Sequence, residues 1–279
     1  MAITAFPMLF SLYLSFTNYD ILSSWEFVEW VGFENYWNLF VNDQTFRHSV
    51  QVTLIFAFVA VPLKLAAALG VALLLNRESR GVGLFRSLFY LPSLLGGSVA
   101  LALIWRAMFS GDGAFNAFLG LFGVTGRPWV NDPTWALETL MVLAIWQFGA
   151  PMVIFLAGLK QVPTELYEAA SVDGAGKIRQ FFNVTLPMLS PVIFFNLVLE
   201  TINGFQGFTA AFVISNGTGG PVDSTMLYTL YLYTKGFTEF QMGYASALAW
   251  VFLIAIGLIT VLFFSTGRFW VHYSDGDND

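Results

Sequence analysis

The sequence contains no cysteine and few charged residues, which make up only 11% of its 279 positions. Without cysteine the chain can form neither a disulfide framework nor a thiolate site. A charged share of this size lies far below the roughly 25% of ordinary soluble domains. The formal net charge of −6 also argues against a surface that binds nucleic acid. Composition therefore disfavours a soluble domain and a nucleic-acid-binding protein.

Motifs for nucleotide hydrolysis and for metal binding are missing as well. A phosphate-binding loop of the form Gly-x-x-x-x-Gly-Lys-Ser/Thr does not occur, because the one Gly-Lys pair, at 176–177, is followed by isoleucine. His48 and His272 are far apart in sequence and belong to no His-Glu-x-x-His motif. The acidic tail at 275–279 is expected to be a solvated chain end. We therefore expect no catalytic residue, no metal and no cofactor in this chain.

What the sequence does contain is apolar and aromatic surface. Hydrophobic residues make up 57% of the chain, with thirty Phe and nine Trp. In a bilayer the Phe side chains can face acyl chains, while Trp and Tyr lie at the headgroups. The first apolar run lacks the basic flank of a signal peptide, so it is interpreted as a spanning helix. The prediction is an all-α integral membrane protein, a single domain over 1–279 with six transmembrane helices at about 1–17, 50–75, 87–110, 135–158, 188–214 and 241–265.

The distribution of Lys and Arg predicts the orientation of these helices. Cytoplasmic loops of membrane proteins carry an excess of Lys and Arg. One set of connecting segments holds seven such residues, namely Arg77, Arg80, Arg86, Lys160, Lys177, Arg179 and Arg268. The opposite set holds three, namely Arg47, Arg127 and Lys235. Both termini and the segment 159–187 are therefore expected on the cytoplasmic side.

The segment 159–187 is a polar insert between two apolar runs. Pro163 ends the preceding helix, Thr164 is expected to cap the next one, and a short helix is predicted over about 165–173. Gly174 and Gly176 then free the backbone to turn, and a second short helix follows. Leu166, Ala169, Ala170 and Asp173 fall on one side of the first helix, a small-residue face that another protein can approach closely. The alternative is an amphipathic connector that lies on the lipid headgroups.

The spacing of Glu168-Ala169-Ala170, Gly174, Val184 and Leu186-Pro187 resembles the signature loop of membrane permeases in binding-protein-dependent ATP-binding-cassette (ABC) importers. Val184 replaces the usual isoleucine. Further segments resemble the carbohydrate-uptake branch, the maltose-permease-like group, and the likeness extends from Pro7 to Tyr273. These segments are Pro7 to Thr17, Gly219-Gly220-Pro221 with Ser224-Thr225, and Met242 to Ala247.

The resemblance implies the function and the partners of the chain. In that family the loop forms a coupling helix that docks on an ATPase subunit, here through Glu168, Ala169, Ala170, Asp173 and Gly174. The expected partners are a second homologous permease, two ATPase subunits that bind ATP and Mg, an extracytoplasmic sugar-binding protein and membrane lipid. The expected location is the cytoplasmic membrane of a bacterium or archaeon.

Polar residues inside the fifth span are candidate substrate contacts, because polar groups are costly in hydrocarbon. Glu200, Asn203, Gly204 and Gly207 follow helical spacing and are predicted to form one stripe near the bilayer midplane, with Phe205 beside them to stack on a sugar ring. The alternative is that the glycines are packing contacts and that Glu200 pairs with Lys64 of the second span. The resemblance places sugar contacts in this segment, although a glutamate is not a fixed feature of the family's pattern.

The fourth span contributes Trp146 and Gln147, which precede Phe148-Gly149-Ala150-Pro151. Proline and glycine predict a broken helix here, and a broken helix at mid-depth commonly lines a cavity. The resemblance also places substrate contacts near this position, whereas ordinary packing is the alternative for Trp146.

The transported substrate is expected to be a neutral di- or oligosaccharide, because a buried Glu200 would repel an anion. Three alternatives remain open at this stage. The chain could be an ion-coupled secondary transporter that uses Glu200, an ABC permease for glycerol phosphate or another sugar derivative, or an intramembrane enzyme.

Overall fold

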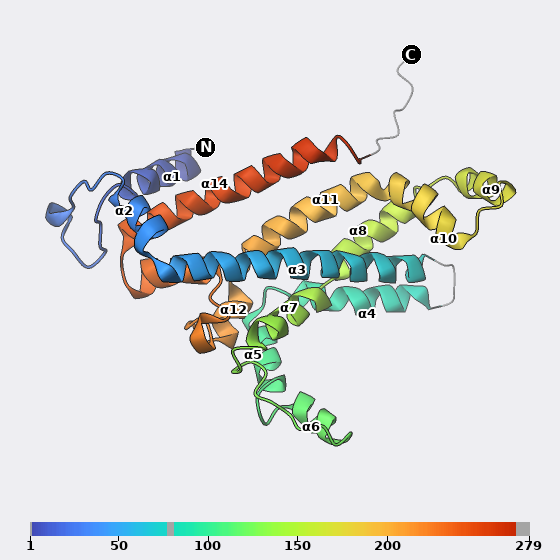
Figure 1. Cartoon of the computed structure of the whole chain (residues 1–279), viewed down its shortest axis with the longest axis horizontal. Coiled ribbons are helices and arrows are strands. Elements are labelled where there is room, and N and C mark those ends of the chain that lie inside the picture. Colours follow the sequence, from blue (N-terminus) through green and yellow to red (C-terminus); the bar gives the residue numbers. More distant parts are fainter. Residues whose placement is uncertain (1, 77–80, 272–279) are drawn as a thin grey trace, which may run out of the picture. The chain divides into compact units, whose positions relative to one another are not determined.

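The computed structural model describes residues 2–76 and 81–271, and helices make up nearly all of the regular structure in them (Figure 1). These residues form no sheet, only one isolated antiparallel bridge between Thr17 and Trp30. The predicted all-α class is confirmed. Arg77, Arg80, His272 and the acidic tail lie outside the described residues.

The chain divides into two compact units, of which the first comprises Met1–Ala57, Ser98–Leu140 and Phe205–Ile259. Its helices and helical turns are α1 (Ala2–Leu14), η1 (Trp25–Phe27), α2 (Glu34–Trp37), η2 (Asn38–Asn42), the first part of α3 (Gln44–Leu75), α5 (Val99–Met108), α6 (Ala114–Gly120), the start of α7 (Ala136–Trp146), α12 (Thr209–Ile214), η4 (Pro221–Asp223), α13 (Tyr228–Tyr233), η5 (Thr234–Thr238) and most of α14 (Met242–Gly267).

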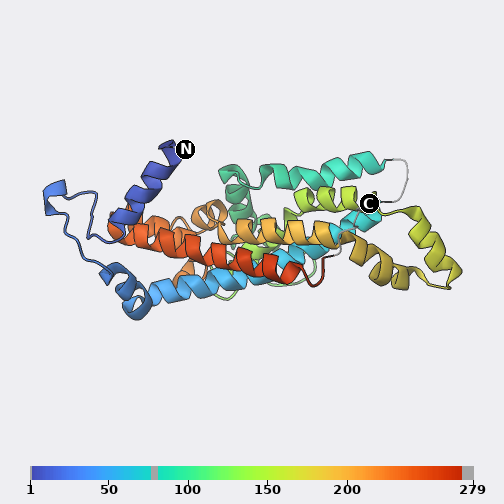
Figure 2. The same cartoon turned by 90° about the horizontal axis from the view of Figure 1, so that it is seen from above.

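The second unit comprises Phe58–Gly97, Met141–Gly204 and Thr260–Asp279. Its helical elements are the rest of α3, α4 (Val82–Leu95), the end of α7, α8 (Gly149–Leu159), α9 (Thr164–Val172), α10 (Lys177–Gln180), η3 (Phe181–Thr185), nearly all of α11 (Leu186–Phe205) and the end of α14. In both views α9 and α10 lie beyond the ends of α8 and α11, which they connect (Figure 1, Figure 2).

Among the described residues, three helical segments are each long and apolar enough to cross a membrane, namely Gln44–Leu75, Lys177–Ile214 and Met242–Gly267. They coincide with the predicted second, fifth and sixth spans. α1 has only 13 described residues, about 20 Å at 1.5 Å per residue, against a hydrocarbon core of about 30 Å. The count of six spanning helices therefore stays a prediction.

The third and fourth predicted spans are each broken into two helices. The predicted third span, 87–110, is not one continuous helix, because α4 ends at Leu95 and α5 begins at Val99. Gly96 and Gly97 weaken the helix, and the Ser98 side chain accepts a hydrogen bond from the Leu101 amide to start a new one. The break expected in the fourth span is confirmed, since α7 and α8 are bent by 41°.

Small residues let the helices of the second unit approach closely. Its core is formed by α3, α8 and α11, with Ala68, Met152 and Leu189 fully buried. A Cβ added at Gly158 of α8 would lie 2.9 Å from Val192 Cγ2 of α11. In a bilayer such close packing, rather than exclusion of water, holds helices together. α8 and α11 are thus in close contact on the side from which the segment 159–187 emerges.

Candidate functional site

The segment between α8 and α11 folds into two short helices, as predicted. α9 runs over Thr164–Val172, within one residue of the expected 165–173. The expectation that Thr164 caps this helix is wrong, because Pro163 occupies the cap position and no side chain bonds the helix start. Proline suits this place, since its extended backbone ends the preceding helix and leads directly into the next. Glu165 lies in the first turn, where the helix dipole favours an anion.

Gly174 closes the C-terminus of α9 in a left-handed conformation, with φ of +77°. The Gly174 amide donates to the Ser171 carbonyl at 3.0 Å, and the Ala175 amide donates to the Ala170 carbonyl at 2.8 Å. This pair of bonds is a Schellman motif, which satisfies carbonyls that a helix end leaves free. The glycine is required because a side chain in this conformation costs about 1–2 kcal/mol. The turn is therefore a defined structure rather than a loose loop.

Gln180 fastens α10 to the end of α9 and was not predicted. Its side chain is buried, and Nε2 donates to Ser171 Oγ at 2.8 Å and to the Ala175 carbonyl at 3.0 Å. A second link joins the hydroxyls of Tyr167 and Thr185 at 3.0 Å. A hollow of about 470 Å³ lies between the two helices, lined by Thr164, Tyr167, Glu168, Ser171, Lys177 and Gln180. These links make the two helices one firm projection.

The predicted docking residues lie on the surface of this projection. Glu168, Ala169, Asp173 and Gly174 are exposed, and Ala170 is half-buried. Apolar side chains beside them are also exposed: the exposed fraction is 89% for Val172 and 77% for Ile178, and Leu166 and Phe182 are exposed as well. Burying one such side chain against a partner contributes about 1.5–3 kcal/mol. The surface is thus suited to a protein partner.

An ion pair joins α11 to α3 inside the second unit. Glu200 Oε2 accepts a hydrogen bond from Lys64 Nζ at 2.7 Å, and the two side chains are 11% and 16% exposed. The pairing that the sequence offered as an alternative is therefore confirmed. Asn196 lies one turn before Glu200 and is buried, and its Nδ2 has no acceptor among the described residues. The spacing i, i−4 from Glu200 was the signal that could have identified it.

The other predicted contacts of the fifth span do not form one helical stripe. Asn203 is exposed and Gly204 is half-buried, both on α11, whereas Phe205 ends the helix with its ring buried. Gly207 lies in the break before α12, where its carbonyl accepts a hydrogen bond from the Thr229 hydroxyl. The expectation of a continuous stripe through Gly207 is wrong, because the helix stops two residues earlier. Sugar contact by these residues stays a prediction.

Trp146 and Gln147 lie at the break between α7 and α8. The Trp146 side chain is 40% exposed and Gln147 is half-buried. A Cβ added at Gly96 would lie 2.4 Å from Gln147 Oε1, so the breaks in the third and fourth spans meet. A Cβ at Gly149 would lie 2.5 Å from the Phe89 carbonyl of α4. At Gly149 only glycine permits this approach to the backbone of α4, whereas at Gly96 the end of the Gln147 side chain would have to move. Substrate contact by Trp146 and Gln147 stays a prediction.

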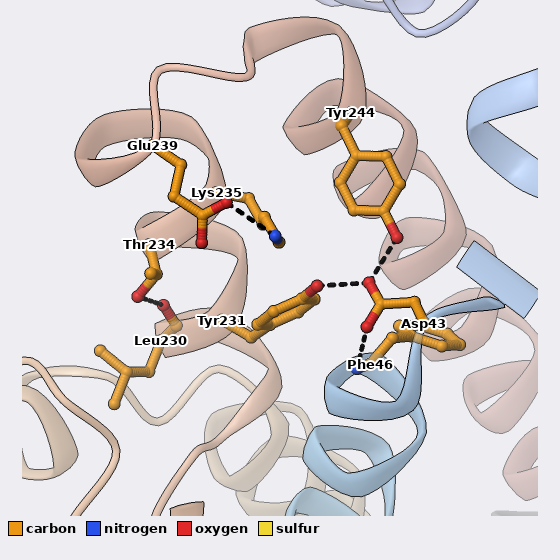
Figure 3. A network of polar contacts seen from close by, with 8 residues as sticks. All are labelled: Asp43, Phe46, Leu230, Tyr231, Thr234, Lys235, Glu239 and Tyr244. Atoms are coloured by element: carbon orange, nitrogen blue, oxygen red, sulfur yellow. Dashed lines mark hydrogen bonds and ion pairs between the residues drawn. The ribbon is translucent and has the colours of Figure 1, made fainter. Parts of the chain in front are cut away.

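A second polar cluster lies in the first unit, around Asp43, and was also missed. The Asp43 carboxylate accepts hydrogen bonds from the hydroxyls of Tyr231 and Tyr244, and from the Phe46 amide at 2.8 Å (Figure 3). Burial raises the pKa of Asp43, but these hydrogen bonds outweigh it and hold the pKa below its ordinary value. The cluster ties the start of α3 to α13 and α14. No sequence pattern indicated this cluster, because its Tyr residues follow neither helical nor strand spacing.

Comparisons with known proteins agree on the class of this chain. A family model described as "Binding-protein-dependent transport system inner membrane component" matches residues 50–275. The probable ABC transporter permease protein YesP of Bacillus subtilis (strain 168) is 50% identical over 271 residues, covering 97% of this chain and 87% of that protein. The lactose transport system permease protein LacF of Rhizobium radiobacter is 35% identical, covering 81% and 78%.

A solved structure shares the fold. The chain is similar to one in the crystal structure of a bacterial alginate ABC transporter in complex with an alginate pentasaccharide-bound periplasmic protein. The TM-score is 0.80 and the identity 20%, with 95% of this chain and 88% of that chain covered. At this identity the likeness speaks for the fold alone.

Proposed function

The chain belongs to the family of binding-protein-dependent transport system inner membrane components, and we propose that it forms the translocation pathway of a sugar importer together with a second homologous permease. Membership makes it a membrane permease of an ABC importer, a subunit without catalytic function. In the proposed assembly two ATPase subunits bind ATP and Mg on the cytoplasmic side. An extracytoplasmic binding protein delivers the sugar.

The observation that carries this proposal is the firm projection between α8 and α11. It exposes Val172 and Ile178 on a backbone fixed by Gly174 and Gln180. A connector surrounded by water has no need of such apolar exposure, whereas a docking element buries it in the complex. We place the contact with the ATPase here, through Glu168, Ala169, Ala170, Asp173 and Gly174. The same assignment puts this projection and both termini in the cytoplasm.

The proposed mechanism is alternating access. ATP binding closes the ATPase dimer, the projection follows, and α8 and α11 carry the displacement into the membrane. ATP can shift the pathway between inward-open and outward-open states only if it binds one state more tightly. A docked projection supplies that difference, because its position changes with the separation of the ATPases.

The proposed substrate is a neutral di- or oligosaccharide. The structure changes the argument for this proposal. Repulsion by a lone Glu200 no longer applies, since Lys64 balances its charge. The pair is net neutral, and an anion at this depth would need a countercharge that Lys64 already gives to Glu200. Relatives named for lactose and for trehalose/maltose transport support a sugar. Relatives named for sn-glycerol-3-phosphate and sulfoquinovosyl glycerol transport support the alternative, a sugar derivative. The uptake experiment must distinguish this class from a neutral sugar.

Reconstitution of the complete importer in vesicles tests the proposal. We expect Ala169→Trp to keep membrane insertion and ATP hydrolysis but to reduce ATP-driven sugar uptake at least tenfold, because a bulky ring prevents close docking. Gln161→Trp, at an exposed position just before α9, is the matched control and should transport normally. Equal uptake by both variants, or uptake driven by a proton gradient without ATP, would overturn the docking assignment.

A further inference from the structure

A cavity of about 570 Å³ opens between α4 and α8 of the second unit. Its lining includes neither Glu200 nor a residue of α9 or α10. Its lining combines two cationic side chains, two hydroxyl groups and an apolar wall, and the residues are Arg86, Ser87, Tyr90, Val153, Leu156, Ala157 and Lys160.

Helix geometry explains why the cavity opens at one end. α4 and α8 approach each other closely at Gly149, where an added Cβ would lie 2.5 Å from the Phe89 carbonyl and 2.7 Å from Tyr90 Cα. Val153 and Lys160 lie further along α8, and with Leu156 and Ala157 between them they follow the spacing i, i+3, i+4, i+7, which is one face of the helix.

The two positive charges lie at the same end of the cavity, although their side chains lean in opposite directions along it. A helical side chain points back toward the start of its own helix. Lys160 follows the last residue of α8 and therefore leans back over the cavity, while Arg86 leans toward the beginning of α4. Since the helices run in opposite directions past each other, both cationic groups lie near the ends that the Lys/Arg distribution assigns to the cytoplasmic surface.

Neither cation is neutralised within the described part of the chain. The ion pairs there join Lys64 to Glu200 and Lys235 to Glu239. One guanidinium nitrogen of Arg86 donates to the Leu75 carbonyl at 3.0 Å, and its buried Nε has no acceptor among residues 2–76 and 81–271. Two positive charges beside an apolar wall without a carboxylate call for an anionic group.

We propose that this cavity binds the headgroup of an anionic phospholipid from the cytoplasmic leaflet. A phosphate can accept hydrogen bonds from Arg86, Lys160 and the Tyr90 hydroxyl, and basic pockets between membrane helices on this side suit such headgroups. The acyl chains have a surface to lie on, because Leu84, Leu88 and Leu91 form an exposed stripe along α4. The combination distinguishes a lipid from a free anion, which would use the charges and leave the stripe bare.

The cytoplasmic location rests on the orientation in the proposed function, but lipid binding can be measured without transport. The complete importer, purified in detergent, is titrated with phosphatidylglycerol, and bound lipid is counted by native mass spectrometry. The double variant Arg86→Gln/Lys160→Gln should bind about 30-fold more weakly, since each cation near an anionic lipid contributes about one kcal/mol. Arg268→Gln, an exposed cation at the end of α14, is the control and should bind as the unaltered importer does.

Two further measurements keep the test decisive. Arg86→Lys/Lys160→Arg should restore most of the binding, which separates loss of charge from misfolding. Phosphatidylcholine should bind no more tightly to the unaltered importer than to the double glutamine variant, and millimolar inorganic phosphate should not displace phosphatidylglycerol. Equal loss in Arg268→Gln, no loss in the double variant, or displacement by phosphate alone would overturn the proposal. Lipid binding without sugar uptake would leave it standing while the proposed function failed.

Discussion

The ion pair between Lys64 and Glu200 gives the sharpest prediction, because it can be broken from either side. Its atoms are 2.7 Å apart, and both side chains are mostly buried. Breaking a buried pair by removing one charge costs about 3–5 kcal/mol, since the other charge stays buried and uncompensated. The residual exposure of 16% and 11% lets water relieve part of this cost. We therefore expect Lys64→Met and Glu200→Met each to lower the free energy of unfolding by about 3 kcal/mol.

The double variant Lys64→Met/Glu200→Met should be more stable than either single variant, because it leaves no buried charge. Unfolding of the complete importer in detergent, followed as a double-mutant cycle, gives the coupling energy directly. The pair formed by Lys235 and Glu239 is a matched control, with the same 2.7 Å separation but with the glutamate 38% exposed. An exposed pair of this spacing contributes only about 0.3–0.5 kcal/mol.

The same variants decide whether Glu200 touches the sugar. If the pair only joins α3 to α11, the apolar double variant should fold and also transport. If Glu200 or Lys64 contacts substrate, the double variant should fold but lose uptake. Additive losses in the two single variants, equal in sum to the loss in the double variant, would show that the pair is not energetically coupled and would refute the reasoning.

Three further changes test the docking projection and the Asp43 cluster. Gly174→Pro removes the amide that bonds Ser171 and forbids φ of +77°, so ATP hydrolysis should continue while vesicle uptake falls at least tenfold; normal uptake would contradict this. Gln180→Leu should increase hydrogen exchange of the α9 amides by about 5- to 150-fold, for a loss of about 1–3 kcal/mol, whereas the exposed Gln161→Leu should not. Asp43→Asn should lower the free energy of unfolding by about 1.5–3 kcal/mol. The folded pKa of Asp43 is lowered, so its contribution to the free energy of unfolding is fully present above its ordinary pKa. This contribution is lost only as the pH falls through the lowered pKa. A stability difference between the two proteins that vanished between pH 8 and pH 5 would contradict this reasoning.

Hydropathy located the long helices but could not locate every break within them. The spans at 50–75 and 241–265 correspond to α3 and α14, because an apolar run of this length has few other solutions in a bilayer. The break at Phe148-Gly149-Ala150-Pro151 was predicted from proline. The break at Gly96-Gly97 was not, although the residues are as permissive. Glycine permits a break but does not impose one, and here the Gln147 side chain lies against Gly96.

The docking projection was predictable because its determinants are local. Pro163 and Gly174 act within a few residues, so their effects can be read in order along the chain. Gln180 and Asp43 act through partners on other elements, and the spacing of residues in the sequence does not predict such contacts. Asp43 meets Tyr231 and Tyr244 across about 190–200 positions of sequence, a separation that only the fold can close.

The positions of these features in the second unit define a path along which we expect a displacement to travel. The projection is firm and joined to α8 and α11, which are locked together where Gly158 meets Val192. We therefore expect a push on the projection to move both helices rather than to deform the loop. Further along, α8 begins at the break beside Gln147, and Gly96 of the neighbouring broken helix lies against the same side chain. Broken helices bend more readily than continuous ones. We therefore expect α8 and α11 to carry the displacement, and the break beside Gln147 to convert it into bending.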